Sequence, residues 1–250
     1  MVDTDLGSFG EGLNVAVVGA TGGIGAAFLA QLRHCPGVAQ LHALSRRPVP
    51  DGSADHWHRL DLEQEESIEA AAQLLRASAG ELHLVIVATG ILHDAAGLQP
   101  EKSWRHLTAD GLAQAFRVNA IGPALLARHL LPLLARDRKA AFAALSARVG
   151  SIADNRLGGW YGYRASKAAL NQTIRCLAIE LARRSDQALC VALHPGTVDT
   201  PLSGPFQRNV PEDRLFAPAE AAAQLLAVLD GLQPADSGGL FAWDGSRIPY

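Results

Sequence analysis

A short apolar run that ends in a glycine cluster is the strongest constraint on the fold. Residues 13–18 are mostly apolar and do not alternate with polar residues, which is typical of a strand buried on both faces of a parallel sheet. The chain then passes through the turn Gly19-Ala20-Thr21-Gly22-Gly23-Ile24-Gly25 into a helix that we expect to end near His34. A strand, a glycine turn and a helix N-terminus in this order form a cradle for a diphosphate, because the backbone can approach the anion and free N–H groups face it.

The end of the second predicted strand, residues 40–44, carries Ser45, Arg46 and Arg47. In dinucleotide-binding folds this position faces the adenosine ribose, and a carboxylate there selects NAD. This chain has two guanidinium groups instead, which favours NADP(H) over NAD(H) because they can bind a 2′-phosphate. The alternative is that both arginines lie in a solvated loop. Asp61 follows a third predicted strand, residues 56–60, and either accepts from the adenine amino group or caps the next helix.

Strands and helices alternate along the rest of the chain. We expect helices over 63–79, 108–135, up to about 184, and from Pro218, and strands over 82–88, 140–145, 188–193 and 239–243. This predicts an α/β fold with one doubly wound parallel sheet of about seven strands and helices on both faces. Residues 13–250 would form a single Rossmann-type domain, 1–12 a flexible tail, and 201–216 a substrate lid.

The predicted helix over 108–135 contains an interruption at Asn119-Ala120-Ile121-Gly122-Pro123. Pro123 has no N–H, so the carbonyl of Asn119 loses its helical donor and the ring crowds that carbonyl into a kink. The freed carbonyl needs another partner, and a water molecule is the natural one. A simple bend around the sheet is the alternative.

Tyr163 and Lys167 stand four residues apart in a segment that predicts a helix, so their side chains project from one face. A phenol in water ionises near pH ~10, and a neighbouring cation can stabilise the phenolate. Lys167 can be that cation. The same spacing also occurs by chance in helices, where it means a half-buried ring beside a solvated amine.

Composition limits the classes of partner and compartment. A net charge of -3 over 250 residues, without a long Lys/Arg run, indicates neither nucleic acid nor an anionic membrane as a partner. Cys35, Cys176 and Cys190 are odd in number and widely spaced in apolar contexts, so we expect core thiols in a reducing cytoplasm, with no disulfide framework and no metal site. Neither a secretory signal nor an apolar run of membrane-spanning length is evident.

Together these motifs resemble the short-chain dehydrogenase/reductase family over nearly the full length. Residues 151–155, 158–167 and 243–249 resemble its C-factor-like or carbonyl-reductase-like members. Ala88-Thr89-Gly90 stands where the family usually has Asn-Ala-Gly. The resemblance implies Tyr163 as general acid, Lys167 as the group that holds the nicotinamide ribose and lowers the tyrosine pKa, and Asn119 as the seat of a water. It also implies a homodimer or homotetramer. The implied cofactor contacts are Gly19, Thr21, Gly23, Ile24, Gly25, Ser45, Arg46, Arg47, Asp61, Leu62, Ala88, Thr89, Gly90, Tyr163, Lys167, Pro195, Gly196, Val198 and Thr200.

One position departs from the family pattern. The active-site serine is expected three residues before Gly150, and Ala147 stands there. Ser146 is our candidate for the missing hydroxyl, with Ser151 as the alternative. We therefore expect an NADP(H)-dependent oxidoreductase that interconverts a carbonyl and an alcohol on a small, fairly apolar substrate. A dinucleotide-binding signalling protein of the C-factor type, with weak or no catalysis, is the second reading.

Overall fold

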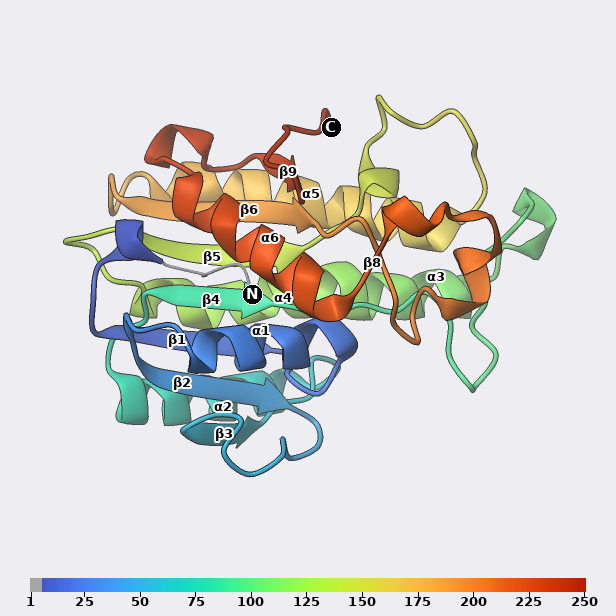
Figure 1. Cartoon of the computed structure of the whole chain (residues 1–250). Coiled ribbons are helices and arrows are strands. Elements are labelled where there is room, and N and C mark those ends of the chain that lie inside the picture. Colours follow the sequence, from blue (N-terminus) through green and yellow to red (C-terminus); the bar gives the residue numbers. More distant parts are fainter. Residues whose placement is uncertain (1–5) are drawn as a thin grey trace.

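The computed structural model describes residues 6–250, and a seven-stranded parallel sheet lies at its centre (Figure 1). The strand order is β3-β2-β1-β4-β5-β6-β9: β2 and β3 are added on one side of β1, and the strands from β4 onward on the other side. The predicted doubly wound parallel sheet is confirmed. The strands are β1 (Leu13–Val18), β2 (Val38–Ser45), β3 (His56–Arg59), β4 (Leu84–Val87), β5 (Ala140–Leu145), β6 (Ala188–His194) and β9 (Leu240–Ala242).

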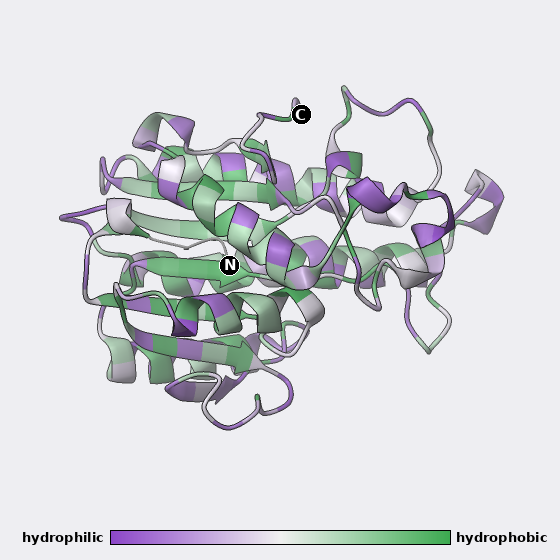
Figure 2. Cartoon of the chain, in the orientation of Figure 1, coloured by the Kyte–Doolittle hydropathy of each residue, from purple (hydrophilic) through white to green (hydrophobic). Residues whose placement is uncertain are grey.

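Helices cover both faces of this sheet. They are α1 (Gly23–Arg33), α2 (Glu65–Ala79), α3 (Ala109–Phe116), α4 (Gly122–Leu130), α5 (Tyr161–Leu181) and α6 (Pro218–Gly231). Phe28 of α1 and Leu225 of α6 belong to one buried cluster, while Ile68 of α2, Leu126 of α4 and Leu170 of α5 belong to another. The central strands β1, β4, β5 and β6 lie between these two cores, which explains why they are almost wholly apolar without alternation. Figure 2 shows this apolar centre in green, with most of the hydrophilic segments on helices and loops.

A π-helical turn separates α3 from α4. It spans Arg117–Ile121, and the N–H of Gly122 donates to the carbonyl of Arg117, five residues back. Pro123 lies in the first turn of α4, so the interruption expected at Asn119–Pro123 is present. Single π-helical turns recur at functional sites, and this one carries the fully buried Asn119.

The segment 201–216, our predicted lid, contains short helices and ends in a strand. It holds 3-10 helices at Gly204–Asn209 and Glu212–Arg214, and β8 (Leu215–Phe216) pairs in parallel with β7 (Thr197–Val198). Gln207 donates to the Asp199 carboxylate at 3.0 Å. The segment is therefore tied at its middle and at its C-terminal end to the loop that follows β6.

Two sequence predictions need correction. The expected flexible tail 1–12 is wrong for the described residues 6–12: Gly7–Phe9 form a 3-10 helix, and Leu6 and Phe9 are buried against the α1/α6 core because both side chains are apolar. Residues 1–5 lie outside the described part. Cys35 and Cys190 are buried as expected, but Cys176 is exposed because it lies on the outer side of α5.

Neither a membrane helix nor a metal site emerges from the described chain. None of the helices within residues 6–250 has the length and apolarity to cross a bilayer. The same residues contain no group of three or more His, Cys, Asp or Glu side chains arranged to hold a metal ion.

Candidate active site

The glycine turn after β1 is packed so closely that side chains are excluded. A Cβ on Gly25 would stand 2.1 Å from the carbonyl oxygen of Gly19, and Gly19 itself has φ +82°, which favours glycine. The turn is closed by the N–H of Gly22, which donates to the carbonyl of Gly19 at 2.9 Å. Gly22 and Gly23 are exposed at the start of α1. A turn whose Gly19 and Gly25 are packed against each other, and whose Gly22 and Gly23 backbone is exposed, allows a diphosphate to approach the backbone closely.

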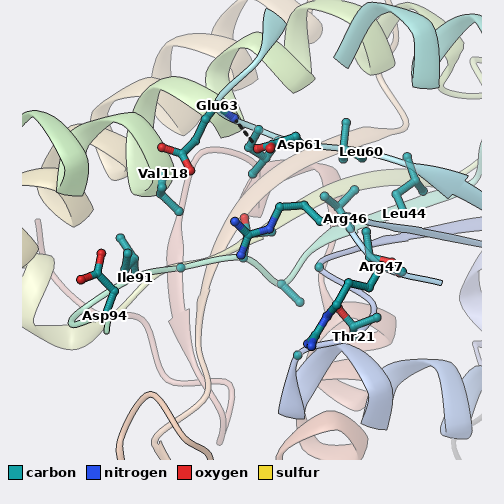
Figure 3. Close-up of a pocket in the computed structure, with 18 of the residues that line it drawn as sticks. Thr21, Leu44, Arg46, Arg47, Leu60, Asp61, Glu63, Ile91, Asp94 and Val118 are labelled. Carbon is teal, nitrogen blue, oxygen red and sulfur yellow. Dashed lines mark hydrogen bonds between the residues drawn. The ribbon is translucent and has the colours of Figure 1, made fainter. Parts of the chain in front are cut away.

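A cavity of about 550 Å³ opens beside this turn, at the carboxyl ends of β1, β2 and β4 (Figure 3). This is the crevice at the topological switch point, where ligands of such sheets bind. Most of the predicted adenosine-side residues lie on its wall. They are Gly19, Thr21, Ser45, Arg46, Arg47, Asp61, Leu62, Ala88, Thr89 and Gly90.

Arg46 and Arg47 supply the free positive charge of this cavity. Both side chains are exposed, and neither guanidinium forms a hydrogen bond or ion pair with any residue in the described chain. Figure 3 shows Arg46 reaching across the cavity and Arg47 extending toward Thr21. Thr89 adds a buried hydroxyl that has no hydrogen-bond partner within residues 6–250. Two free guanidinium groups and an unpaired hydroxyl fit a phosphorylated nucleotide.

Asp61 also lies on the cavity wall, and its second predicted role is wrong. The helix that follows, α2, has Gln64 as its N-cap residue, because it begins at Glu65 and not directly after Asp61. The Asp61 carboxylate instead accepts from the N–H of Glu63 at 3.1 Å in a local turn. Its contact with an adenine amino group stays a prediction.

Lys167 and Asn119 meet near Gly90, and Tyr163 lies beside Lys167. A Cβ on Gly90 would lie 3.5 Å from both the Asn119 Oδ1 and the Lys167 Nζ atoms. Lys167 is buried, its Nζ donates to the carbonyl of Leu145 at 2.8 Å, and it stands 5.8 Å from the centre of the Tyr163 ring. Gly90 lines the cavity, whereas Tyr163, Lys167 and Asn119 do not, so the structure connects the predicted phenol and ammonium pair to the cavity wall through the approach of Lys167 to Gly90.

The Asn119 side chain is fixed by three hydrogen bonds. Its Oδ1 accepts from the N–H of Ile91 at 2.8 Å, and its Nδ2 donates to the carbonyl of Ile91 at 2.9 Å and to Ser166 Oγ at 3.1 Å. The side chain therefore joins the loop after β4 to α5. The predicted water on the Asn119 carbonyl stays a prediction.

The electrostatics of the pair differ from the expectation that Lys167 makes Tyr163 acidic. Burial raises the pKa of Tyr163 to about 12 and lowers the pKa of Lys167 to about 8. Desolvation acts against the charged form of each group and is the cause of both shifts. At neutral pH the pair is therefore a protonated phenol beside an ammonium, which is the state of a proton donor.

Neither candidate serine forms a hydrogen bond with Tyr163 within the described chain. Ser146 is buried, and its hydroxyl donates to Asn171 Oδ1 at 2.7 Å. The Ser151 hydroxyl accepts from the N–H of Asp154 at 3.1 Å. Asn171 lies one further turn along the Tyr163–Lys167 face of α5, so Ser146 is held against that face. The role of Ser146 as a donor to substrate stays a prediction.

The remaining predicted residues come from the loop after β6. Thr200 lies against the glycine turn, since a Cβ on Gly23 would be 2.7 Å from its Cγ2 atom. Gly196 has φ +76° and faces the Phe216 ring, and the buried Val198 packs with that ring and with Ile24. Pro195 is buried at the same bend. None of these lines the cavity of the described chain, although Thr200 touches the turn that does.

Several cavity residues were missed by the sequence analysis. Ile91 and His93 directly follow Thr89-Gly90, so their place at a strand end could have indicated them. Residues on α3 and the π-helical turn carry no local signal, because which side of a helix meets the cavity depends on the tertiary packing. The missed residues include Gly22, Glu63, Ile91, His93, Asp94, Gln114 and Val118.

Comparison with known proteins agrees with this site. A family model described as enoyl-(acyl carrier protein) reductase matches residues 37–232. The chain is similar to the C-signal protein of Myxococcus xanthus, with 36% identity over 139 residues that cover 56% of this chain and 78% of that protein. It is also similar to 1-hydroxy-2-glutathionyl-2-methyl-3-butene dehydrogenase of Rhodococcus sp. strain AD45, with 32% identity over 76% of this chain and 78% of that one.

Among solved structures, the fold is similar to that of NADPH-bound carbonyl reductase from chicken fatty liver. The TM-score is 0.82 with 28% identity, over 96% of this chain and all (100%) of that one. The matches and the site define an NAD(P)-dependent oxidoreductase of carbonyl-reductase type. The chain belongs to the short-chain dehydrogenase/reductase family.

Proposed function

We propose that this protein is an NADP(H)-dependent reductase of small, fairly apolar carbonyl compounds. The observation that carries the proposal is the approach of the buried ammonium of Lys167 both to the Tyr163 ring, 5.8 Å from its centre, and to Gly90 on the cavity wall, where a Cβ would lie 3.5 Å from Nζ. The bound nicotinamide would supply the hydride. The chain's own residues would hold the substrate, exclude water and provide the proton.

In this proposal Tyr163 donates its hydroxyl proton to the substrate oxygen as that oxygen gains negative charge. A pKa of about 12 keeps the phenol protonated at neutral pH, and the Lys167 ammonium favours the phenolate that forms. Lys167 is itself oriented by the carbonyl of Leu145. Because its pKa is lowered to about 8, we expect kcat/KM for reduction to fall as pH rises through 8.

The preference for NADP(H) is supported by the free guanidinium groups of Arg46 and Arg47 and by the NADPH in the similar chicken structure. A charge-assisted hydrogen bond contributes about 1.5–3 kcal/mol, so Arg46→Ala/Arg47→Ala should weaken NADPH binding by about tenfold to a hundredfold. NADH binding should change little. Equal affinity for NADPH and NADH in the unmodified protein would contradict this preference.

The assay that tests the function uses purified protein, NADPH and a panel of aldehydes, ketones and diketones. We expect turnover by the unmodified protein and a large loss in Tyr163→Phe, which keeps the ring and removes the proton. Tyr161→Phe is the matched control, because Tyr161 is two residues away in the same helix. Equal turnover by Tyr163→Phe and the unmodified protein would exclude Tyr163 as the acid.

A signalling role with little catalysis is the second candidate. It is supported by Ala147 at the serine position, by the Ser146 hydroxyl that donates to Asn171, and by similarity to the C-signal protein. This role predicts NADP(H) binding with no turnover of any carbonyl in the panel. Loss of turnover in Ser146→Ala, with NADPH binding retained, would instead support catalysis.

A further inference from the structure

Trp160 occupies a backbone conformation that is unusual for a residue with a side chain. Among residues 6–250 it is the one residue other than glycine with a positive φ, at φ 51° and ψ 43°. This left-handed conformation brings Cβ close to the following carbonyl and is unfavourable. Such residues persist where the surrounding structure holds them, and they gather at functional sites. Trp160 lies directly before α5, three residues from Tyr163.

Glu101 holds Trp160 in place. The N–H of Trp160 donates to the backbone carbonyl of Glu101 at 2.6 Å. The buried carboxylate of Glu101 accepts from the N–H of Gly162, at 3.3 Å for one oxygen and 3.1 Å for the other. The carboxylate thus accepts from a free N–H in the first turn of α5, a role that the indole of Trp160 at the N-cap position does not fill. Its negative charge is also favourable at the positive end of the helix dipole.

The indole of Trp160 contacts the active-site phenol on one side and the lid on the other. Its ring centre is 6.3 Å from that of Tyr163 and 5.0 Å from that of Phe206, both edge to face. Phe206 in turn lies 5.7 Å from His93, which lines the cavity. All four side chains are half-buried, so part of each ring surface is open. They form one aromatic wall, defined as Tyr163, Trp160, Phe206 and His93.

The lid approaches the site at two points. Leu202 Cδ1 would be 3.9 Å from a Cβ on Gly90, at the same point that Lys167 Nζ would approach to 3.5 Å. Four residues further on, Phe206 contacts Trp160. Trp160 precedes Tyr163 in the chain and Lys167 follows it, so the lid segment between Leu202 and Phe206 contacts the surroundings of the phenol on both sides. Figure 1 shows this orange segment beside the beginning of α5.

We propose that Trp160 and Phe206 are specificity-determining residues that select carbonyl substrates with a flat, uncharged ring next to the carbonyl. The ring of the substrate packs on the aromatic wall while its oxygen meets Tyr163. This proposal rests on the proposed reductase function and names the substrate class for it. Flat rings gain from edge-to-face and offset contacts with such a wall, whereas small aliphatic carbonyls reach the phenol without touching it.

The test compares benzaldehyde with propanal as substrates under saturating NADPH, in the unmodified protein and in Trp160→Ala and Phe206→Ala. Trp104→Ala is the matched control, because Trp104 is exposed and its indole lies beside the Arg105 guanidinium, 5.8 Å from the ring centre. Aromatic contacts of this kind predict that the benzaldehyde-to-propanal ratio of kcat/KM falls about tenfold in Trp160→Ala, mainly through KM for benzaldehyde. We expect the same direction in Phe206→Ala and an unchanged ratio in Trp104→Ala.

A merely structural role of Trp160 would lower kcat/KM for both aldehydes together, and Phe206→Ala, on the lid, then decides. An unchanged ratio in Phe206→Ala as well would overturn the proposal. Absence of turnover in the unmodified protein would contradict the reductase function itself. In that case ligand NMR titrations of the NADPH-loaded protein with benzamide and propionamide decide: tighter binding of benzamide that is lost in both variants supports the aromatic wall, and equal binding of the two amides overturns it.

Discussion

His42 provides a sharp test of the electrostatics of this fold. It is fully buried in β2 and stacks on His56 and His58 of β3, with ring centres 4.9 and 5.5 Å away. Its Nδ1 lies 3.2 Å from the His58 Nε2, and its own Nε2 has no hydrogen-bond partner in the described chain. Burial, followed by His56 and His58, lowers the pKa of His42 from 6.5 to about 4, against a smaller opposing effect of Asp55. The folded protein therefore keeps this imidazole neutral.

In the unfolded chain the His42 imidazole binds a proton at a higher pH than in the folded protein. Between pH 6.5 and about 4 the unfolded state binds more protons at this site, so the free energy of unfolding falls as pH drops through that window. At pH 5 the protonation of His42 in the unfolded state lowers the free energy of unfolding by about 2 kcal/mol, at ~1.4 kcal/mol per pH unit. His42→Phe keeps a ring in the core and removes the titration. The variant should lose about 2 kcal/mol less stability between pH 7 and pH 5.

Urea unfolding at pH 7, 6 and 5 measures this difference. Comparing each protein with itself at pH 7 cancels the packing change that the substitution introduces. His106→Phe is the control, because His106 is exposed, and it should follow the unmodified protein. If His42→Phe loses as much stability on acidification as the unmodified protein, His42 is not held neutral by burial and the reasoning is refuted.

Two further predictions concern the cradle and the end of α6. Gly25→Ala should abolish NADPH binding and lower the free energy of unfolding by at least ~2 kcal/mol, because its Cβ would stand 2.1 Å from the Gly19 oxygen. The control Gly204→Ala, whose Cβ would meet open space, should change neither NADPH binding nor stability. Thermal melts measure the stability of each variant, and NADPH fluorescence measures the binding. Lys139→Met should lower stability by about 2 kcal/mol, because the Nζ atom donates to three carbonyls at the end of α6 at 2.7–3.0 Å. A melting temperature equal to that of the exposed-site control Lys102→Met would contradict this second expectation.

The elements that the sequence predicted well are those with strong local signals. The run 13–18, the glycine turn and Pro123 each restrict the backbone directly, and the sheet, the cradle and the interrupted helix follow from them. Tyr163 and Lys167 were found because helical spacing fixes which side chains share a face. Their pKa values were not, because desolvation depends on the surrounding protein and not on spacing.

Other features depend on contacts between distant segments. Glu101 reaches the start of α5 across about sixty residues of sequence, and nothing near it marks a helix-capping carboxylate. Ser146 meets Asn171 only because the loop after β5 packs on α5, where a Cβ on Gly150 would be 2.8 Å from Lys167 Cβ. The histidine stack at His42 likewise needs the pairing of β2 with β3. Local sequence patterns do not encode such contacts.

The buried N-terminal segment has a practical consequence for anyone who shortens this protein. Leu6 and Phe9 precede the first strand, yet both side chains belong to the hydrophobic core that includes α6. Ser8 donates two hydrogen bonds to Asp230 near the end of α6. Full burial of such a side chain is worth about 1.5–3 kcal/mol. A chain shortened to start at residue 13 would lack these two core side chains and would expose the apolar surface that they cover. Purification tags therefore belong ahead of Leu6.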